Sequence, residues 1–269
     1  MSKEFFIFPY KAESEGAKKL SEALDCYRIS RTNSRFTRSD DKIIINWGWG
    51  NTLPTEVAAC PIIINQPASV EKAIDKIKAF QCFREHMIAC PDWTTNRTEA
   101  ESWWRSGYPV YCRTQTSGHD GSGLVAAHNS YTCPVPVTVV DAPLYTRGIQ
   151  GGSGLDEYRV SVFGDEAISY QKKVIRSDFI GVPNHLVRTS GNGWGFDYVS
   201  ERYVPHQVDA EAVAAVQALG LDFGGVDVLY STVYRKAYVL EVNTAPELTP
   251  FSLGKLKDAL LQYKESLEE

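Results

Sequence analysis

Cysteine is sparse in this 269-residue sequence, and the cysteines that occur show none of the spacings that bind metals or form redox pairs. No two of them make a CxxC arrangement, which argues against a zinc site and against a dithiol centre. We therefore expect reduced side chains that serve packing. We assign chemistry to none of the six, which are Cys26, Cys60, Cys82, Cys90, Cys112 and Cys133.

Long apolar runs are lacking as well. No segment approaches the roughly 20 apolar residues that a membrane-spanning helix needs, and no low-complexity tract is present. The opening segment MSKEFFIFPY enters a short apolar strand directly, without the apolar core and cleavage site of a secretion signal. The sequence predicts a globular, cytoplasmic protein with no membrane partner.

A generally basic surface is missing too, because the net charge is −5. This balance argues against nucleic acid as a partner, although a local basic patch can still receive an anion. Arg28, Arg31, Arg35 and Arg38 form such a patch, and their spacing would align them on one helical face. The surrounding Ser, Thr and Asn residues make a poor helix, so a solvated basic loop is the favoured interpretation. The patch hints at an acidic substrate.

Isoleucine runs dominate the first part of the chain. KIIIN ends at Asn46, PIIIN ends at Asn65, and residues 4–8 form a third short run, a pattern typical of parallel strands buried on both faces. A helix over residues 14–24 separates the first two strands along the chain, which predicts a small α/β lobe. In such a sheet the crevice lies beyond the carboxyl ends of the strands, so we expect two segments to border a site, Trp47–Asn51 and Gln66–Ser69.

The middle of the chain predicts a long helix followed by a glycine loop. An apolar stripe runs from Val70 to Met87 at helical spacing, and ACPDWT then breaks it, which marks a lobe boundary. The next segment reads as strand, polar loop and strand. Its loop over residues 114–122 holds two glycines, and a third, Gly123, follows directly. Such a loop is either a plain connection or a donor of backbone N–H groups to phosphate oxygens.

The last part of the chain predicts two hairpins and two helices. Alternating strands flank the turn at Gly164, and a helix from Asp209 to Leu219 has Asp209 as its expected N-cap and Gly220 as its stop. Two further strands over residues 221–230 and 236–243 follow, and then a helix over residues 253–267.

Three oxygen-bearing side chains stand out in this last part. Glu241 and Asn243 lie two residues apart in an apolar strand and so share a face, and Asp227 lies in the strand before it. If the hairpin register brings the three together, they suit a hard cation such as Mg²⁺, which takes a few oxygen ligands from the protein. Taken singly, Asp227 would cap a turn and Glu241 would pair with an arginine.

In combination, the glycine loop, the basic strand residues and the oxygen cluster resemble the ATP-grasp superfamily over nearly the whole chain. The match is closest in style to carboxylate–amine ligases of the ribosomal-protein glutamate ligase type and to bacteriophage ATP-grasp proteins. The resemblance implies an α/β class with α+β lobes, namely an ATP-grasp fold behind an N-terminal Rossmann-like lobe. The expected divisions are residues 1–90, a central lid lobe over 91–147, and a C-terminal lobe over 148–269. The segments that carry it are AIDKIKAF, VYCRTQTSGHDGSGL, LYTRGI, EYRVSVF, ALGLDFGGVDVL and YVLEVNTAPEL.

The same resemblance implies two cofactors, ATP and Mg²⁺. The residues that would bind ATP are Lys76, Arg113, Ser117, Gly118, Gly121, Gly123, Leu144, Tyr145, Thr146 and Lys172. Lys173 is an equal alternative to Lys172, and the metal would fall to Asp227, Glu241 and Asn243. The pattern departs from the superfamily in two places: Arg113 stands where a lysine is usual, and no acidic residue accompanies the hinge at Tyr145 and Thr146. The second departure leaves the choice between adenine and guanine open.

The expected activity is that of an ATP-dependent ligase that joins a carboxylate to an amine through an acylphosphate. Arg159 would contact phosphate or substrate, Arg188 would clamp a carboxylate, and Asn192 would orient it or complete the metal shell. The partners would be a small-molecule or peptide carboxylate and an amine, in a host cytoplasm if a phage encodes the chain. A kinase on the same scaffold and a non-catalytic nucleotide-binding module are the alternatives, and the three metal oxygens argue against the module.

Overall fold

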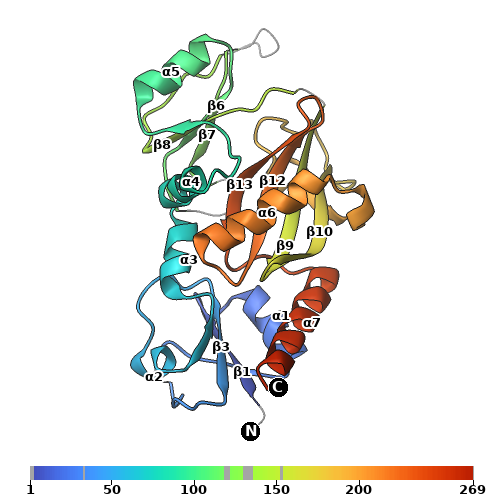
Figure 1. Cartoon of the computed structure of the whole chain (residues 1–269). Helices are drawn as coiled ribbons and strands as arrows, with labels where there is room; N and C mark the ends of the chain where they lie inside the picture. The colour runs from blue at the N-terminus through green and yellow to red at the C-terminus, as the bar shows by residue number, and fades with distance from the viewer. Residues whose placement is uncertain (1–2, 33, 118–121, 130–135, 152–153, 269) are drawn as a thin grey trace.

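The computed structural model describes residues 3–32, 34–117, 122–129, 136–151 and 154–268. Its three β-sheets follow one another along the long axis of the molecule, with both chain ends beside the N-terminal sheet (Figure 1). The Lys3 N–H donates to the Glu268 carboxylate at 2.6 Å, which ties the two ends together. Within the described residues, no helix combines the length and apolar character needed to cross a membrane.

The N-terminal sheet is entirely parallel, as the isoleucine runs predicted, with strand order β2-β1-β3-β4. Its strands are β1 (Glu4–Pro9), β2 (Tyr27–Arg28), β3 (Lys42–Trp47) and β4 (Ile62–Ile64). Ile43, Ile44 and Ile45 are fully buried, because helices and other strands cover both faces. Two helices belong to this region, α1 (Glu15–Ala23) and α2 (Thr55–Ala58).

The arginine-rich segment between β2 and β3 has no regular secondary structure in its described residues. Arg28 ends β2, and the described residues of 29–40 form no helix or strand. The loop interpretation is therefore confirmed for Arg31, Arg35 and Arg38 but not for Arg28, and the helical alignment of the arginines is wrong. The five cysteines that the structure describes are free, in line with their expected packing role.

The single long helix predicted from Val70 to Met87 is wrong. Two helices replace it, α3 (Pro67–Ile74) and α4 (Lys76–Glu85), and they meet at Asp75, which has an extended conformation. The Asp75 carboxylate accepts hydrogen bonds from the N–H groups of Ile77 and Lys78, so it caps α4 instead of continuing α3.

A small antiparallel sheet lies at the other end of the molecule, with strand order β5-β8-β6-β7 (Figure 1). Its strands are β5 (Trp93–Thr94), β6 (Val110–Arg113), β7 (Leu124–Ala127) and β8 (Leu144–Arg147), and α5 (Arg97–Arg105) packs on it. β6 and β7 pair directly, which confirms the predicted strand, loop and strand.

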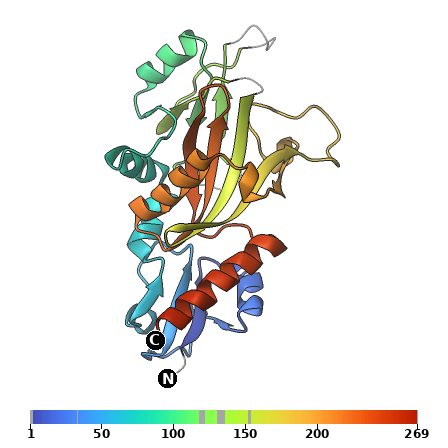
Figure 2. The ribbon, with the colours of Figure 1, turned by 45° about the vertical axis from the view of Figure 1, so that its right-hand side comes forward.

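The central sheet has five antiparallel strands in the order β11-β10-β9-β12-β13. They are β9 (Leu155–Phe163), β10 (Glu166–Ile175), β11 (Trp194–Tyr198), β12 (Phe223–Ser231) and β13 (Lys236–Asn243), and both predicted hairpins are confirmed. Helix α6 (His206–Leu219) covers one face (Figures 1 and 2). The predicted cap at Asp209 is wrong, because Asp209 lies inside α6 and accepts the Tyr170 hydroxyl at 2.7 Å, whereas Gly220 ends the helix at φ 71° as expected. Two 3₁₀ turns flank β11, Ser190–Asn192 and Glu201–Tyr203.

The hydrophobic cores combine residues from different expected lobes of the chain. The last helix, α7 (Pro250–Ser266), starts at a Thr249 capping box and returns to pack on α1 and the N-terminal sheet. Helices α3 and α4 share their core with α6 and the central sheet. Boundaries near residues 90 and 147 therefore remain a proposal about the chain, while the packing joins the lobes into one body.

Candidate active site

A central cavity of about 900 Å³ lies on the face of the five-stranded sheet that α6 leaves free. Its walls come from all three sheets: β6 and the end of β8, the strands β9, β10, β12 and β13, and the turn between β1 and α1. Strand alternation explains the polarity of this face. Tyr158, Val160 and Val228 point to the core under α6, and their neighbours in sequence point to the cavity.

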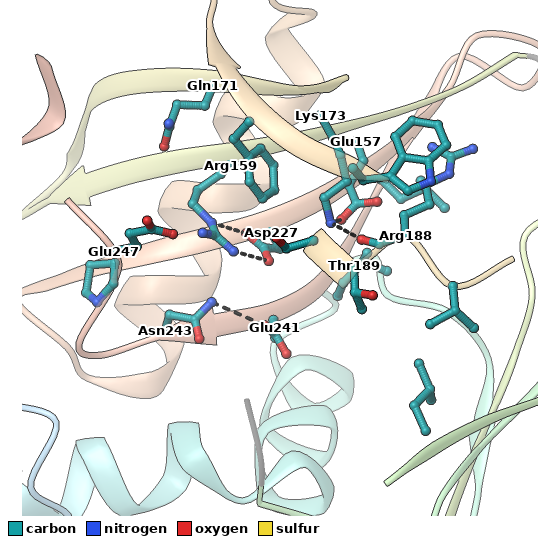
Figure 3. Close-up of a pocket in the computed structure, with 18 of the residues that line it drawn as sticks. Glu157, Arg159, Gln171, Lys173, Arg188, Thr189, Asp227, Glu241, Asn243 and Glu247 are labelled. Atoms are coloured by element: carbon teal, nitrogen blue, oxygen red, sulfur yellow. Dashed lines mark hydrogen bonds and ion pairs between the residues drawn. The ribbon is translucent and has the colours of Figure 1, made fainter. Parts of the chain in front are cut away.

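One row of polar side chains crosses four neighbouring strands at the floor of the cavity (Figure 3). In register, Gln171 of β10 lies opposite Arg159 of β9, Arg159 opposite Asp227 of β12, and Asp227 opposite Glu241 of β13. Directly opposite residues share a face, so the four side chains enter the same space. The predicted partners Asp227 and Glu241 are thus cross-strand neighbours. A β-bulge follows immediately, where Val228 pairs with Val239 and the strand twists beside the site.

Arg159 donates two parallel hydrogen bonds to the Asp227 carboxylate. Its Nε lies 2.7 Å from Oδ1 and its Nη2 lies 2.9 Å from Oδ2, the bidentate geometry of strong arginine–carboxylate pairs. The guanidinium carbon also lies 4.3 Å from the ring centroid of Phe196. Burial lowers the pKa of Arg159, but the attraction and hydrogen bonds of Asp227 outweigh it and raise the pKa above its ordinary value. Arg159 is therefore a permanent cation at this wall.

Lys76 binds Glu241 from the opposite side through a single contact between its ammonium group and the carboxylate. Its Nζ lies 2.6 Å from Oε2, and the Asn243 amide donates to Oε1 at 3.2 Å. Burial raises the pKa of Glu241, but the Lys76 charge and these hydrogen bonds reverse the effect and lower it to about 2. The helix break at Asp75 makes this contact possible, because it puts Lys76 at the start of α4, where its N–H donates to Thr116 O at 3.1 Å.

A second charged group lies next to the row. Lys173 contacts the Glu157 carboxylate and donates to the Arg188 carbonyl at 2.9 Å, and Arg188 donates to Leu155 O at 3.0 Å. The Arg188 guanidinium also lies 4.9 Å from the ring centroid of Trp194. Burial raises the pKa of Glu157, and the charge of Lys173 opposes that rise. These contacts hold the segment that contains Arg188 against the mouth of the cavity.

Arg113 is the charged residue with the poorest hydrogen bonding here. It lines the cavity from β6, and its buried Nε has no hydrogen-bond partner among the described residues. Burial lowers the pKa of its guanidinium, with partial compensation from Glu241. A buried cation without a full set of partners is costly, so an anion in the cavity would improve its environment.

The remaining predicted ATP residues fall into different places. Thr146 lines the cavity, whereas the side chains of Leu144 and Tyr145 are buried in two hydrophobic cores. Lys172 points away and pairs with Asp156 at 2.9 Å, because neighbouring residues of a strand alternate in direction. Ser117 and Gly123 are described but do not line the cavity. Two of the predicted residues, Gly118 and Gly121, lie outside the described part of the chain.

Two expectations about the substrate side need correction. Asn192 does not line the cavity, because its amide donates to Val187 O at 2.8 Å and closes the turn there. Neither Trp47–Asn51 nor Gln66–Ser69 reaches the cavity. The turn between β1 and α1 contributes instead, with Tyr10, Lys11 and Glu13–Gly16 among the lining residues.

Sequence reasoning missed two residues of the central cavity, Glu157 and Gln171, and it left Lys173 and Lys172 equal where the structure places only Lys173 in the lining. The signal was present. Glu157 stands two residues before Arg159, and Gln171 stands two residues before Lys173, the same spacing that linked Glu241 to Asn243. Gln171 is only 6% exposed, and its side chain has no hydrogen-bond partner among the described residues, so its amide is available to a ligand.

Charges divide the cavity into two sides. The cations Arg113, Arg159, Lys173 and Arg188 belong to β6, to the central sheet and to the segment before β11. On the side of the N-terminal sheet, the lining carboxylates are Glu13, Glu15 and Glu247, all exposed and none with an ion pair in the described residues, and Lys11 adds one cation there. Because carboxylates outnumber cations on this side, the arrangement can hold an anion on one side and a cation on the other.

The side-chain oxygens at the floor of the cavity supply only part of the ligand shell of a hard cation. No group of three His, Cys, Asp or Glu side chains in the described residues could hold a metal. Asp227 and Glu241 supply two carboxylates and Asn243 an amide oxygen, a set that suits Mg²⁺ when ligand phosphates and water complete the shell. The low pKa of Glu241 keeps that ligand ionised.

The chain resembles known ligases in sequence, although at low identity. No family model matches the chain. A probable alpha-L-glutamate ligase of Histophilus somni (strain 2336) is 26% identical over 213 residues, which is 77% of this chain and 67% of that protein. A probable alpha-L-glutamate ligase 2 of Hahella chejuensis (strain KCTC 2396) is 23% identical over 214 residues, 74% of this chain and 65% of that protein.

Solved structures resemble the whole chain. D-alanine–D-alanine ligase from Bacillus anthracis superposes with a TM-score of 0.65 at 13% identity, covering 99% of this chain and 98% of that one. The ATP-grasp ligase PsnB in complex with a minimal precursor gives 0.64 at 14% identity, covering 97% and 99%. The fold expected from the sequence motifs is thus confirmed.

Proposed function

We propose that this chain, whose fold is that of the ATP-grasp ligases, joins a carboxylate to an amine with the hydrolysis energy of ATP. The observation that carries the proposal is the row across β9, β12 and β13, at the floor of a cavity large enough for a nucleotide and a substrate. There Arg159 of the row binds Asp227, and Lys76 of α4 binds Glu241. The two curated relatives described above are named as probable glutamate ligases, which supports the same reaction class.

The nucleotide would lie between the small sheet and the central sheet. Apolar side chains gather at that end of the cavity, including Phe80, Ile149, Leu229 and Leu240, and they offer flat surfaces to a base. Thr146, Arg147 and Gly148 border the same end. The N–H groups of Arg147 and Gly148 donate to Asp92 O at 2.8 Å and Pro109 O at 2.7 Å, so they hold this wall in place for a base, and the buried side chains of Leu144 and Tyr145 support it. The phosphates would then extend to Lys76, Arg113 and Arg159.

Magnesium would be held by Asp227, Glu241 and Asn243, and when bound it would neutralise phosphate charge. PsnB has been solved with Mg and ADP, which supports this cofactor set. In the protein itself, Lys76 and Arg159 balance the two carboxylates. Both cations lie beside the phosphate path, so each can share its donors between a carboxylate and a phosphate oxygen as the nucleotide binds.

In the proposed reaction, a substrate carboxylate oxygen attacks the γ-phosphorus of ATP, the bond to ADP breaks, and an acylphosphate forms. The amine then attacks the acyl carbon, the carbon–nitrogen bond forms, phosphate leaves with its bridging oxygen, and the amine loses a proton. Arg159, Lys173 and Arg188 would hold the anionic partners in line, and the charge of these residues matters most as charge moves in the transition state. The carboxylates on the other side suit a positively charged amine.

Oxygen labelling tests this reaction directly. The protein is screened with ATP, Mg²⁺, amino acids and ¹⁸O-labelled carboxylates, and ADP, phosphate and products are analysed by mass spectrometry. We expect ADP and phosphate in equal amounts, one ¹⁸O atom in the phosphate, and an amide product. A stable phosphorylated product without free phosphate would instead identify a kinase, and nucleotide binding without any turnover would identify a binding module.

A further inference from the structure

A second pocket of about 640 Å³ lies at the carboxyl edge of the N-terminal parallel sheet. It occupies the place where β2, β1 and β3 end side by side, at the switch point of a sheet whose order is β2-β1-β3-β4. Crevices at such switch points commonly bind ligands. We name it the Arg28–Arg31 pocket. Its lining residues are Phe8, Pro9, Ala12, Arg28, Ile29, Ser30, Arg31, Thr32, Trp49, Thr52, Leu53 and Pro54.

Its charge is of one sign. Arg28 and Arg31 are the only charged residues among those that line it, both are exposed, and neither has an ion pair within the described residues. One Arg28 N–H donates to Ala12 O at 3.1 Å, which fixes the guanidinium and leaves its other donors free. The Arg31 guanidinium lies 4.9 Å from the ring centroid of Trp49, so an indole holds it in place. Two oriented, uncompensated guanidinium groups make a receptor for carboxylates.

The Arg28–Arg31 pocket adjoins the central cavity. The turn between β1 and α1 separates the two, and its residues alternate between them: Pro9 and Ala12 line the pocket, whereas Tyr10, Lys11 and Glu13 line the cavity. A ligand that reaches both must be long enough to pass over this turn. A single small metabolite that fills the cavity does not extend that far, but an extended chain does.

We propose that the Arg28–Arg31 pocket binds an acidic side chain of a peptide substrate whose reacting carboxylate lies in the central cavity. The inference rests on the proposed ligase function for the identity of the cavity, but the pocket itself is argued from its own geometry. The apolar walls from Phe8, Ile29 and Leu53 suit the aliphatic stem of such a side chain. Nucleic acid fits less well, because the net charge of −5 and two arginines offer little to a run of phosphates.

The test measures peptide binding without ATP, so that it does not depend on turnover. Fluorescein-labelled hexaglutamate is titrated with the whole protein by fluorescence anisotropy, and hexaglutamine and oligo(dT) serve as comparison probes. We expect hexaglutamate to bind and hexaglutamine to bind far more weakly. In the double variant Arg28→Gln/Arg31→Gln, hexaglutamate affinity should fall at least about tenfold, since two charge-assisted contacts are lost.

Arg38→Gln is the matched control. It removes an arginine from the same irregular segment, but this one pairs with Asp40 and does not line the pocket, so hexaglutamate affinity should stay within about twofold of wild type. Equal affinities of the wild type and the double variant would overturn the proposal, as would the absence of hexaglutamate binding. Tighter, equally arginine-dependent binding of oligo(dT) would overturn the assignment to a peptide.

The test of the Arg28–Arg31 pocket and the test of the ligase function can fail independently of each other. Arginine-dependent peptide binding without any ADP-linked product would support the pocket and contradict the ligase. An amide product from other substrates, together with no peptide binding, would support the ligase and contradict the pocket. Melting temperatures of all variants confirm that a loss of binding does not reflect unfolding.

Discussion

Two clusters of buried polar side chains satisfy their hydrogen bonds in opposite ways. At the junction between the N-terminal and central sheets, amides bond to backbone; at the floor of the central cavity, charges bond to charges. The junction is centred on Asn65, which is fully buried and has a φ of 62°. The cavity floor is centred on the Asp227–Glu241 pair, which faces open space.

The junction is a closed network. The Asn65 carbonyl oxygen of the side chain accepts from the N–H groups of Asp222 and Phe223 at 2.7 and 3.1 Å, and its amide donates to Phe223 O at 3.0 Å. Asn46 donates to the Asn65 backbone carbonyl at 2.8 Å and to Trp49 O at 2.9 Å. The repeated IIIN motif therefore places two linked amides at this edge of the sheet: Asn65 bonds to the central sheet, and Asn46 holds Asn65 from within the N-terminal lobe. Such a network stabilises one arrangement and leaves nothing for a ligand.

The cavity floor is an open network. Among the residues that the structure describes, the Arg113 Nε and the Gln171 amide have no hydrogen-bond partner, and the two carboxylates are held by cations that a phosphate can also engage. The comparison teaches that burial of polar groups alone does not mark a site in this protein. What marks it is buried polarity with donors left over.

The largest expected effect is on turnover. Glu241→Gln keeps the shape and an oxygen that Lys76 can bond, but removes the charge that the proposed metal site needs, so we expect kcat to fall by about 10²- to 10³-fold. The melting temperature should fall by several degrees, because Lys76 loses its charged partner, while the variant stays folded at the assay temperature. Coupled ADP-release kinetics and thermal unfolding measure the two.

Glu22→Gln on the exposed surface of α1 is the control and should match wild type in both measurements. A folded Glu241→Gln protein with wild-type turnover would remove the metal role of the cavity floor.

The junction should respond in the opposite way. Asn65→Ala strands two N–H groups and one carbonyl, so the free energy of unfolding should fall by about 3 kcal/mol while turnover per folded molecule is kept. Urea unfolding and active-site-normalised kinetics test this.

Asn65→Gly separates backbone strain from hydrogen bonding, because glycine accepts the positive φ without cost. It should lose nearly as much stability as Asn65→Ala. Full stability of the glycine variant would mean that the loss in Asn65→Ala comes from the strain of a positive φ, and not from the lost hydrogen bonds.

Arg113 sharpens the comparison, because here stability and binding should change in opposite directions. Arg113→Met removes a buried, incompletely paired cation, so the nucleotide-free protein should be as stable as wild type or more so. ATP affinity should fall by about 10- to 100-fold, as a charge-assisted contact is lost.

Arg113→Lys restores the residue usual in ATP-grasp proteins and should keep most of that affinity. Calorimetry measures the change in ATP affinity, and thermal unfolding without ATP measures the change in stability. A destabilised Arg113→Met protein with unchanged ATP affinity would make Arg113 a structural residue.

The smallest expected effect is on the pH dependence of stability. Glu241 has its pKa lowered from 4.5 to about 2 in the folded protein, so its contribution is complete above about pH 4.5 and is lost as the pH falls towards 2. The difference in unfolding free energy between wild type and Glu241→Gln should be widest at neutral pH and narrow below pH 4.5. Urea titrations across that range measure it. A constant difference would show that Lys76 does not hold the carboxylate ionised.

Local patterns in the sequence predicted much of this fold. The isoleucine runs gave the parallel strands, alternation and turns gave both hairpins, and the spacing of two gave Glu241 and Asn243 one face. The long helix failed at Asp75, because its apolar stripe continues across the break and hides the competition of one side chain for backbone N–H groups. The same break places Lys76 beside Glu241, so this error concealed the contact between the two.

The sequence by itself determined which chemical groups are present and which neighbours share a face, since strand and helix periods depend only on local backbone geometry. Tertiary structure alone decided which faces meet. Register between strands set Arg159 beside Asp227 and Asp227 beside Glu241, and the packing of α4 set Lys76 beside Glu241, 165 residues away along the chain. The turn after β1 became a wall of the cavity for the same reason. Charge pairing acts through space, and distance in space is fixed only when the sheets pack.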